Sequence, residues 1–208
     1  MRKMEIRLDR LPLRERNKQR VTQRIITVAV ELFKTRGYHQ TTIDEIAEKA
    51  EISRGTLFNY FPSKEALLLP WAHEILDGHI YPRVSAFLNT QPTTMAGLRL
   101  LFTVITETVT ASPDVVQAFM HESLQSHDAS QKALVENGIQ RIFLHVIRYG
   151  QEKGEVRTDI PSDHLAFYLS ALLAPLLFSV LELGGPEAAS INLDTVLSFI
   201  MTGLRSGP

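Results

Sequence analysis

The sequence predicts an all-α protein, and three observations support this fold class. Apolar residues recur at helical spacing along most of the 208-residue chain. The alternating apolar and polar pattern of a half-buried β-strand is weak almost everywhere. Serines and threonines that suit helix N-caps, and glycines and prolines that end helices, separate the apolar stretches. We therefore expect an N-terminal three-helix domain followed by a C-terminal bundle of about five to six helices.

The composition is that of an ordinary globular protein, with 44% hydrophobic and 22% charged residues. The chain has no cysteine, which excludes disulfides, thiol catalysis and cysteine-bound zinc and fits a cytoplasmic location. No apolar segment of the signal-peptide type follows the charged start of the chain. Residues 165–181 carry no charge, but their length, serines and proline favour a buried helix at a subunit interface, so we expect no membrane partner.

Charge is divided unevenly along the chain. Residues 1–64 contain 14 Lys and Arg against 8 Asp and Glu, whereas the remaining residues contain 8 against 15. A basic first third joined to an acidic remainder indicates that the N-terminal part binds a polyanion. A solvated basic arm is the alternative that charge alone leaves open.

The helix signals divide the chain into a basic flexible arm (1–15), a three-helix domain (16–62) and a C-terminal helical domain (63–208). The first helix is expected over about residues 17–36, with one apolar stripe and Gly37 at its end. That stripe consists of Ile25, Ala29, Leu32 and Phe33.

The next segment predicts two short helices joined by a tight turn. Thr42 and Glu45 have the spacing of a capping box, in which each side chain binds the other residue's backbone amide. The helix that they open extends to about Ala50, and Ser53 caps a third helix that Pro62 ends. Two such helices form a helix-turn-helix, although an ordinary helical hairpin with a polar outer face would have the same pattern.

The third helix has outward side chains that suit the major groove of DNA, which such a helix enters N-terminus first. Arg54 suits guanine O6 and N7 in a bidentate pair, and Asn59 suits adenine. Gly55 lets the backbone approach the DNA closely. Phosphates, which position the helix without reading the sequence, suit Thr56, Tyr60 and Lys64.

The segment from Gly37 to Leu67 resembles the signature of the tetracycline-repressor (TetR) family, above all in the run TLFNYFPSKE that begins at Thr56. The resemblance covers about residues 20–68. It implies three DNA-binding helices and then a divergent helical domain that dimerises and usually holds a small ligand. Carried over by position, it implies DNA contacts from Thr42, Arg54, Gly55, Thr56, Phe58, Asn59, Tyr60 and Lys64.

Two residues depart from the family pattern. Phe58 stands where the family usually has tyrosine, so the hydroxyl that would bind a phosphate is missing and the ring suits only a sugar or a thymine methyl. Glu51 stands where the family usually has the glycine of the turn. A positive φ at that position would cost a glutamate about 1 kcal/mol.

The C-terminal domain should contain helices over about residues 64–77, 93–110, 113–125, 130–153, 162–183 and 193–204. Gly78 and Pro82 should interrupt or kink the chain after the first of these. The domain has no nucleophile motif, no glycine-rich phosphate loop and no histidine pair at metal-binding spacing. We therefore expect neither an enzyme nor a cofactor or metal site.

Two sets of C-terminal residues are candidates for ligand binding and dimerisation, and plain core packing is the alternative for both. Aromatic side chains that suit a pocket between helices are Phe102, Phe119, Phe143, Phe167 and Tyr168. Residues that suit a four-helix bundle across a two-fold axis are Leu165, Leu169, Leu172, Leu176, Val196, Phe199 and Ile200.

The expected function is that of a homodimeric repressor that binds a near-palindromic double-stranded DNA operator and is released by a small-molecule effector. One alternative is a helical enzyme or small-molecule binding module whose basic head is vestigial. Another is a DNA-binding activator or architectural protein without an effector. Sequence-selective DNA binding separates the first alternative from the expectation, and a response to a small molecule separates the second.

Overall fold

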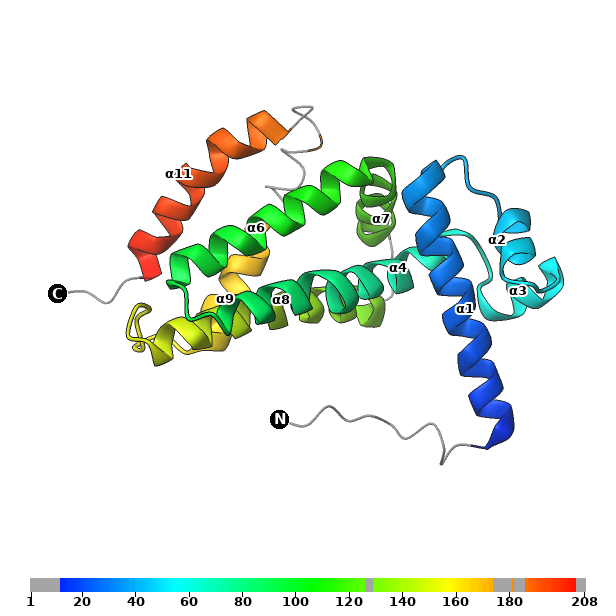
Figure 1. Cartoon of the computed structure of the whole chain (residues 1–208), viewed down its shortest axis with the longest axis horizontal. Helices are drawn as coiled ribbons and strands as arrows, with labels where there is room; N and C mark the ends of the chain where they lie inside the picture. The colour runs from blue at the N-terminus through cyan, green and yellow to red at the C-terminus, as the bar shows by residue number, and fades with distance from the viewer. Residues whose placement is uncertain (1–11, 126–128, 174–180, 182–185, 205–208) are drawn as a thin grey trace. The chain divides into compact units, whose positions relative to one another are not determined.

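The computed structural model describes residues 12–125, 129–173, 181 and 186–204, and every regular element in these ranges is a helix (Figure 1). The expectation of an all-α protein is thereby confirmed. The chain divides into two compact units, Met1–Trp71 and Ala72–Pro208, which we call unit 1 and unit 2. Along the described ranges, no helix is both long and apolar enough to cross a bilayer.

Unit 1 is built from α1 (Leu13–Arg36), α2 (Ile43–Lys49) and α3 (Arg54–Tyr60). α2 packs against both α1 and α3. The core of the three helices consists of side chains that are at most 3% exposed, namely Ile25, Ala29, Leu32, Phe33, Ile46, Ala47, Ala50 and Leu57. The apolar spacing in the sequence predicts these residues, because they share the inner faces of their helices.

α1 begins at Leu13, earlier than the predicted Asn17. The buried residues of α1 all lie in its second half, so its first turns have no apolar stripe that would reveal a helix in the sequence. These turns are rich in Arg, Lys and Gln, which form helices readily, and Glu15 lies in the first turn, where an acidic side chain is favourable. Residues 13–15, assigned to the flexible arm from the sequence, are therefore helical.

The starts of α2 and α3 carry the side-chain caps that the sequence predicts. At α2, the Glu45 amide donates to the Thr42 hydroxyl (3.2 Å) and the Thr42 amide donates to the Glu45 carboxylate (2.9 Å), which completes the capping box. At α3, the Thr56 amide donates to the Ser53 hydroxyl (3.1 Å). These bonds satisfy amides that a bare helix end would leave unpaired.

Unit 1 extends beyond the predicted boundary at residue 62. The Lys64 ammonium donates to the Tyr38 carbonyl oxygen (2.9 Å) and so attaches the start of η2 (Glu65–Leu67) to the three-helix domain. The division between the two units comes after Trp71.

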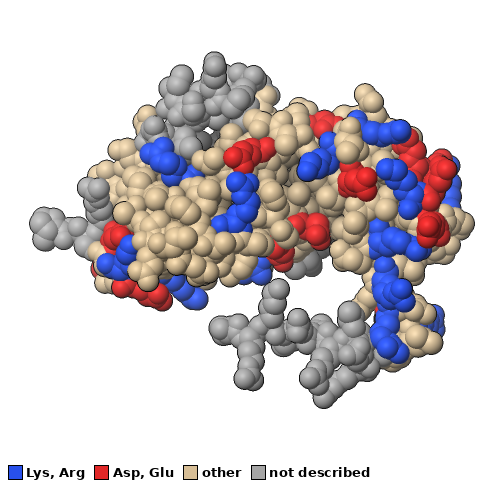
Figure 2. Space-filling model, viewed as in Figure 1, with Lys and Arg blue, Asp and Glu red and all other residues tan. Residues whose placement is uncertain are grey.

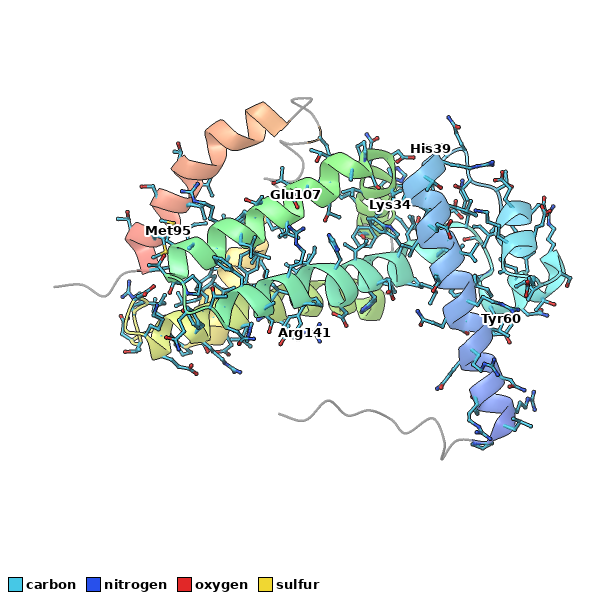
Figure 3. The ribbon with its side chains drawn as sticks, in the orientation of Figure 1. Lys34, His39, Tyr60, Met95, Glu107 and Arg141 are labelled. Carbon is cyan, nitrogen blue, oxygen red and sulfur yellow. The ribbon has the colours of Figure 1, made fainter. Side chains whose placement is uncertain are left out.

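Unit 2 consists of helices that pack around α6 and α8. After α4 (Leu68–Glu74), in which the division falls, the elements are η3 (Ile75–Ile80), α5 (Tyr81–Leu88), α6 (Thr94–Ala111), α7 (Pro113–Gln125), α8 (Ala129–Glu152), α9 (Ser162–Ala171) and α11 (Pro186–Leu204). α9 packs along α8, and α6 contacts α5, α7, α8 and α11. Arg83 of α5 donates to Glu107 of α6 (2.8 Å), and Arg141 of α8 forms an ion pair with Asp77 of η3. Figure 3 labels Glu107 and Arg141 on their helices.

Three helix boundaries in unit 2 differ from those predicted. The chain is helical through Gly78 and Pro82: Gly78 lies in the π-helix η3, and Pro82 lies in the first turn of α5, where a helix tolerates a proline. The apolar helix predicted over residues 162–183 is described as α9 up to Ala171, and residues 174–180 lie outside the described ranges. α11 begins at Pro186, earlier than the predicted residue 193.

The capping box at α2 predicts how the stability of the protein depends on pH. The backbone amide of Thr42 lowers the pKa of the Glu45 carboxyl below its ordinary value of 4.5, and nearby Arg36 acts in the same direction. A carboxylate with a lowered pKa stabilises the fold above its unfolded-state pKa, and this contribution is lost as the pH falls through the folded-state value. We expect Glu45→Gln to flatten the loss of stability below about pH 4.5, as measured by thermal unfolding from pH 7 downward. Glu48→Gln on the same helix is the control, and equal slopes for the two variants would contradict the assignment.

Candidate nucleic-acid interface

One face of α3 is exposed, and it carries the side chains that the sequence assigns to DNA contacts. The exposed residues are Arg54, Gly55, Phe58 and Asn59. Leu57 is fully buried in the core of unit 1, whereas Thr56 and Tyr60 are half-buried. Because Leu57 fixes the rotation of a helix of only two turns, the polar face of α3 is held outward.

Gly55 has no steric reason within unit 1 to be a glycine. A Cβ atom at this position would lie 3.9 Å from the Ser53 Oγ, which is an ordinary van der Waals distance. Gly55 is the second residue of α3, where alanine, the better helix former, should be no less favourable than glycine. The missing side chain therefore matters on the outer face, where it lets another molecule approach the backbone closely.

The turn between α2 and α3 is a Schellman motif. The Glu51 amide donates to the Glu48 carbonyl oxygen (3.0 Å), and the Ile52 amide donates to the Ala47 carbonyl oxygen (3.0 Å). Glu51 has a φ of 53°, the left-handed conformation that glycine adopts most easily. The strain that the sequence predicts for a glutamate at this position is therefore present, and Arg24 of α1 lies 3.4 Å from the Glu51 carboxylate.

Two residues expected to contact DNA also form hydrogen bonds inside unit 1. Lys64 donates to the carbonyl oxygens of Tyr38 (2.9 Å) and Thr41 (3.1 Å), and its Nζ lies 4.2 Å from the centre of the Tyr38 ring. The Thr42 hydroxyl accepts from the Glu45 amide and donates to the Glu45 carboxylate (3.1 Å). These bonds hold local structure and leave the Lys64 ammonium one of its three N–H donors for a phosphate, so the DNA contacts of Lys64 and Thr42 remain predictions.

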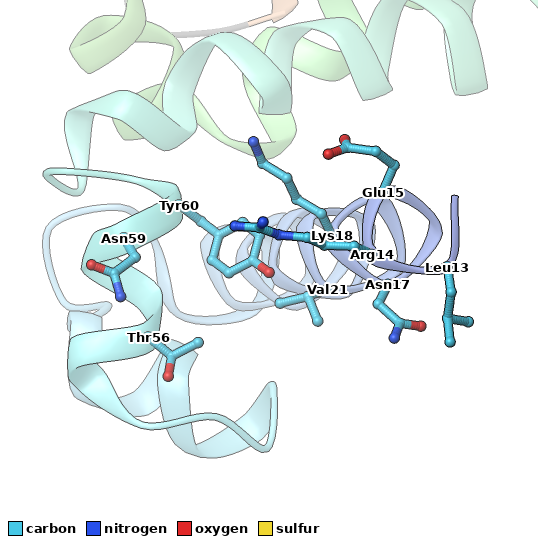
Figure 4. Close-up of a pocket in the computed structure, with 9 residues that line it drawn as sticks. All are labelled: Leu13, Arg14, Glu15, Asn17, Lys18, Val21, Thr56, Asn59 and Tyr60. Carbon is cyan, nitrogen blue, oxygen red and sulfur yellow. The ribbon is translucent and has the colours of Figure 1, made fainter. Parts of the chain in front are cut away.

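α1 and α3 enclose an open groove of 860 Å³ in unit 1. Thr56, Asn59 and Tyr60 of α3 form one wall. The other wall comes from the first turns of α1 and contains Leu13, Arg14, Glu15, Asn17, Lys18 and Val21 (Figure 4). The exposed face of α3 is therefore continuous with a groove that has basic side chains on its far side.

Basic side chains follow one another along the first half of α1 (Figure 2). They are Arg14, Arg16, Lys18, Arg20 and Arg24. Glu15 is the one acidic residue in the sequence from 13 to 24. Sequence reasoning did not assign any of these residues to the interface, although the basic excess in residues 1–64 was the signal that could have found them.

The aromatic residues assigned to a ligand pocket fall into two groups. Phe102 and Phe143 are buried, and their ring centres lie 5.8 Å apart in an edge-to-face contact. Phe119 is half-buried. Phe167 and Tyr168 are each 56% exposed, so these two belong to the surface of unit 2 and do not line its interior.

The residues assigned to a dimer interface are also divided by their exposure. Leu172 (44%) and Phe199 (74%) are exposed, and Val196 is half-buried. Residues on the inner faces of α9 and α11 belong instead to the core of unit 2, with at most 6% exposure; these are Leu165, Leu169 and Ile200. Leu176 lies outside the described ranges.

Comparison with known proteins finds relatives along most of the chain. Residues 25–69 match the family described as bacterial regulatory proteins, tetR family. The HTH-type transcriptional repressor KstR2 of Rhodococcus jostii is 27% identical over 192 residues, which cover 88% of this chain and 90% of that protein. The uncharacterized HTH-type transcriptional regulator YuxN of Bacillus subtilis is 33% identical over 98 residues, but the match spans only 33% of YuxN.

A solved structure shows the same extent of similarity. FadR of Thermus thermophilus, a TetR family transcriptional repressor in complex with lauroyl-CoA, has a TM-score of 0.70 and 28% identity to this chain. The alignment covers 90% of this chain and 97% of FadR. The similarity therefore extends far beyond the segment that matches the family signature.

Gly55→Ala separates DNA binding from folding. We expect this variant to bind duplex DNA about tenfold more weakly, because a methyl group holds the helix away from the base edges. Its unfolding temperature should be equal or higher, since alanine favours the helix. Fluorescence anisotropy with labelled duplex and circular-dichroism melting measure the two quantities. A less stable variant with unchanged DNA affinity would overturn this interpretation.

The groove between α1 and α3 predicts contacts that do not depend on the DNA sequence. The double variant Arg14→Gln/Lys18→Gln should weaken binding to all duplexes alike and reduce the slope of log affinity against log salt by about 2, since each lost phosphate contact contributes about 0.9. Lys34→Gln, at the far end of α1, is the matched control and should leave the slope unchanged. The groove plays no such part if both variants give the wild-type slope.

Proposed function

The chain belongs to the TetR family of bacterial regulatory proteins and is a DNA-binding transcriptional regulator, and we propose that it acts as a homodimeric repressor that leaves its operator when a small molecule binds. The observation that carries the proposal is the exposed face of α3, which presents Arg54, Gly55 and Asn59. Membership of a family of transcriptional regulators also argues against the alternative function, an enzyme with a vestigial basic head.

In the proposed complex, α3 lies in the major groove and reads base edges. Arg54 supplies a planar set of donors for guanine O6 and N7, and the Asn59 amide matches adenine N6 and N7. Phe58, exposed between them on the same helix, suits the methyl group of a thymine. Each bidentate contact of this kind discriminates against a wrong base by about 1–3 kcal/mol.

The groove between α1 and α3 suits the sugar-phosphate strand that borders the major groove. A strand in this groove would pass Thr56 and Tyr60 on the α3 side and Arg14 and Lys18 on the α1 side. Contacts to phosphates fix the register of the recognition helix and supply most of the sequence-independent affinity.

Exposed apolar side chains on unit 2 support the proposed dimer. Phe167 and Tyr168 of α9, Leu172 directly after it and Phe199 of α11 are all at least 44% exposed. Large apolar side chains that are exposed to water mark protein interfaces where they form one surface. A two-fold axis through such a patch would pair each residue set with its own copy. The two α3 helices would then enter successive major grooves about 34–36 Å apart on a near-palindrome.

The effector class that we propose is a fatty acyl-CoA thioester. The related FadR of Thermus thermophilus has been solved with lauroyl-CoA, and buried side chains of α6 and α8 in this chain, such as Phe102 and Phe143, are apolar. An apolar interior suits the acyl chain of such a thioester, although not its charged CoA part. Release requires that the effector bind the DNA-free arrangement more tightly than the DNA-bound one.

Selection of duplexes from a random library by the wild-type protein tests the proposed function. The selected sites should be near-palindromes, and anisotropy titrations should show affinity falling steeply with salt. Lauroyl-CoA should lower affinity for a selected duplex by about 5- to 150-fold, whereas CoA alone and laurate alone should not. If the selection enriches no sequence, the repressor proposal is wrong. Enrichment with no response to lauroyl-CoA removes this effector class and leaves sequence-specific DNA binding in place.

Phe199→Asp tests the dimer. A carboxylate in an apolar interface cannot be desolvated without a partner, so the variant should be a monomer of 23.5 kDa by light scattering. It should bind a selected palindrome at least about a hundredfold more weakly, because the gain from linking two heads is lost. Thr110→Asp, which places the same charge at an exposed position of α6, is the control. A dimeric Phe199→Asp protein would exclude this surface as the interface.

A further inference from the structure

The Arg54 guanidinium is held from two directions on the exposed face of unit 1. Its Nη1 donates to both carboxylate oxygens of Asp44 in α2, at 3.1 Å and 3.0 Å. Its central carbon lies 5.5 Å from the centre of the Phe58 ring, one turn further along α3. An arginine on a surface would otherwise sample many rotamers, so these contacts restrict the direction in which the guanidinium points.

Folding stability does not explain this arrangement. The side chains of Arg54 and Asp44 are 62% and 64% exposed, and ion pairs this exposed add little to stability. The two residues also belong to different helices, so their pairing requires the relative placement of α2 and α3 that the turn provides. Because the ion pair adds so little to folding stability, we look for its effect on a molecule that binds the exposed face of unit 1.

Pairing changes what the guanidinium attracts. The Asp44 carboxylate offsets the positive charge of Arg54, which weakens the long-range attraction for a phosphate. Hydrogen-bond donors remain, because the contacts to Asp44 use only Nη1, and no described residue accepts a hydrogen bond from Nε or Nη2. These two nitrogens form one planar edge, which matches the paired O6 and N7 acceptors of guanine in the major groove.

We propose that Asp44 is a positioning residue that restricts Arg54 to guanine and disfavours its use as a phosphate contact. The proposal rests on the DNA-binding function proposed above and assigns base selectivity to the pair rather than to Arg54 alone. Asp44 needs no contact with DNA for this effect. Its carboxylate repels phosphates that approach Arg54, and its hydrogen bonds fix the guanidinium edge that meets the base.

The test compares the wild type with Asp44→Asn, Arg54→Ala and Glu48→Gln. Glu48 is an exposed carboxylate on the same helix as Asp44, so its variant removes equal charge without changing the Arg54 contacts. The probes are the duplex that the wild type selects, the same duplex with single guanines replaced by 7-deazaguanine, and an alternating A·T duplex as non-specific DNA. Replacement by 7-deazaguanine removes only the N7 acceptor. Circular-dichroism melting confirms that each variant is folded.

The wild type and Glu48→Gln should lose about tenfold in affinity when one particular guanine of each half-site is replaced. In Asp44→Asn and Arg54→Ala this loss should disappear. Asp44→Asn should also lower the ratio of selected to non-specific affinity by about tenfold, partly through tighter non-specific binding.

A 7-deazaguanine loss in Asp44→Asn equal to that of the wild type overturns the proposal. Tighter binding of Asp44→Asn to the selected duplex alone also overturns it, because Asp44 would then withhold Arg54 from the base. These outcomes differ from failure of the proposed function, in which the wild type itself selects no duplex.

Discussion

The turn between α2 and α3 is the constraint on which the DNA-facing part of unit 1 depends. Two backbone hydrogen bonds close it, and Glu51 adopts a φ of 53° to complete it. A non-glycine residue in this conformation costs about 1–2 kcal/mol, which the packing of the flanking helices must offset. The turn sets the direction of α3, and with it the position of Arg54 opposite Asp44.

Residues at the interface divide according to whether the protein itself uses their polar groups. The Lys64 ammonium donates to two carbonyl oxygens in the connection between α1 and α2. The Thr42 hydroxyl is part of the capping box at the start of α2. Asn59 and Tyr60 instead line a groove that faces the basic start of α1. The first pair holds the surface in place, and the second pair lines the groove beside it.

Unit 2 shows how one helix serves both a core and a surface. α9 is apolar on most of its circumference, with Leu165 and Leu169 buried and Phe167 and Tyr168 exposed. A helix that is apolar on all sides is normally enclosed by other elements. In this chain the inner face packs along α8, and the outer face is the surface that we propose a second copy covers.

The sequence by itself determined the all-α class, the caps of α2 and α3 and the core of unit 1. The helical period of 3.6 residues, the Thr42–Glu45 capping box and the Ser53 cap each involve residues a few positions apart. They can therefore be recognised from the sequence alone. The tertiary structure alone decided that Lys64 binds Tyr38, that Arg54 pairs with Asp44, and which side of α9 is exposed. The physical reason is that these contacts join side chains on different helices, whose rotation and distance depend on packing rather than on spacing in the chain.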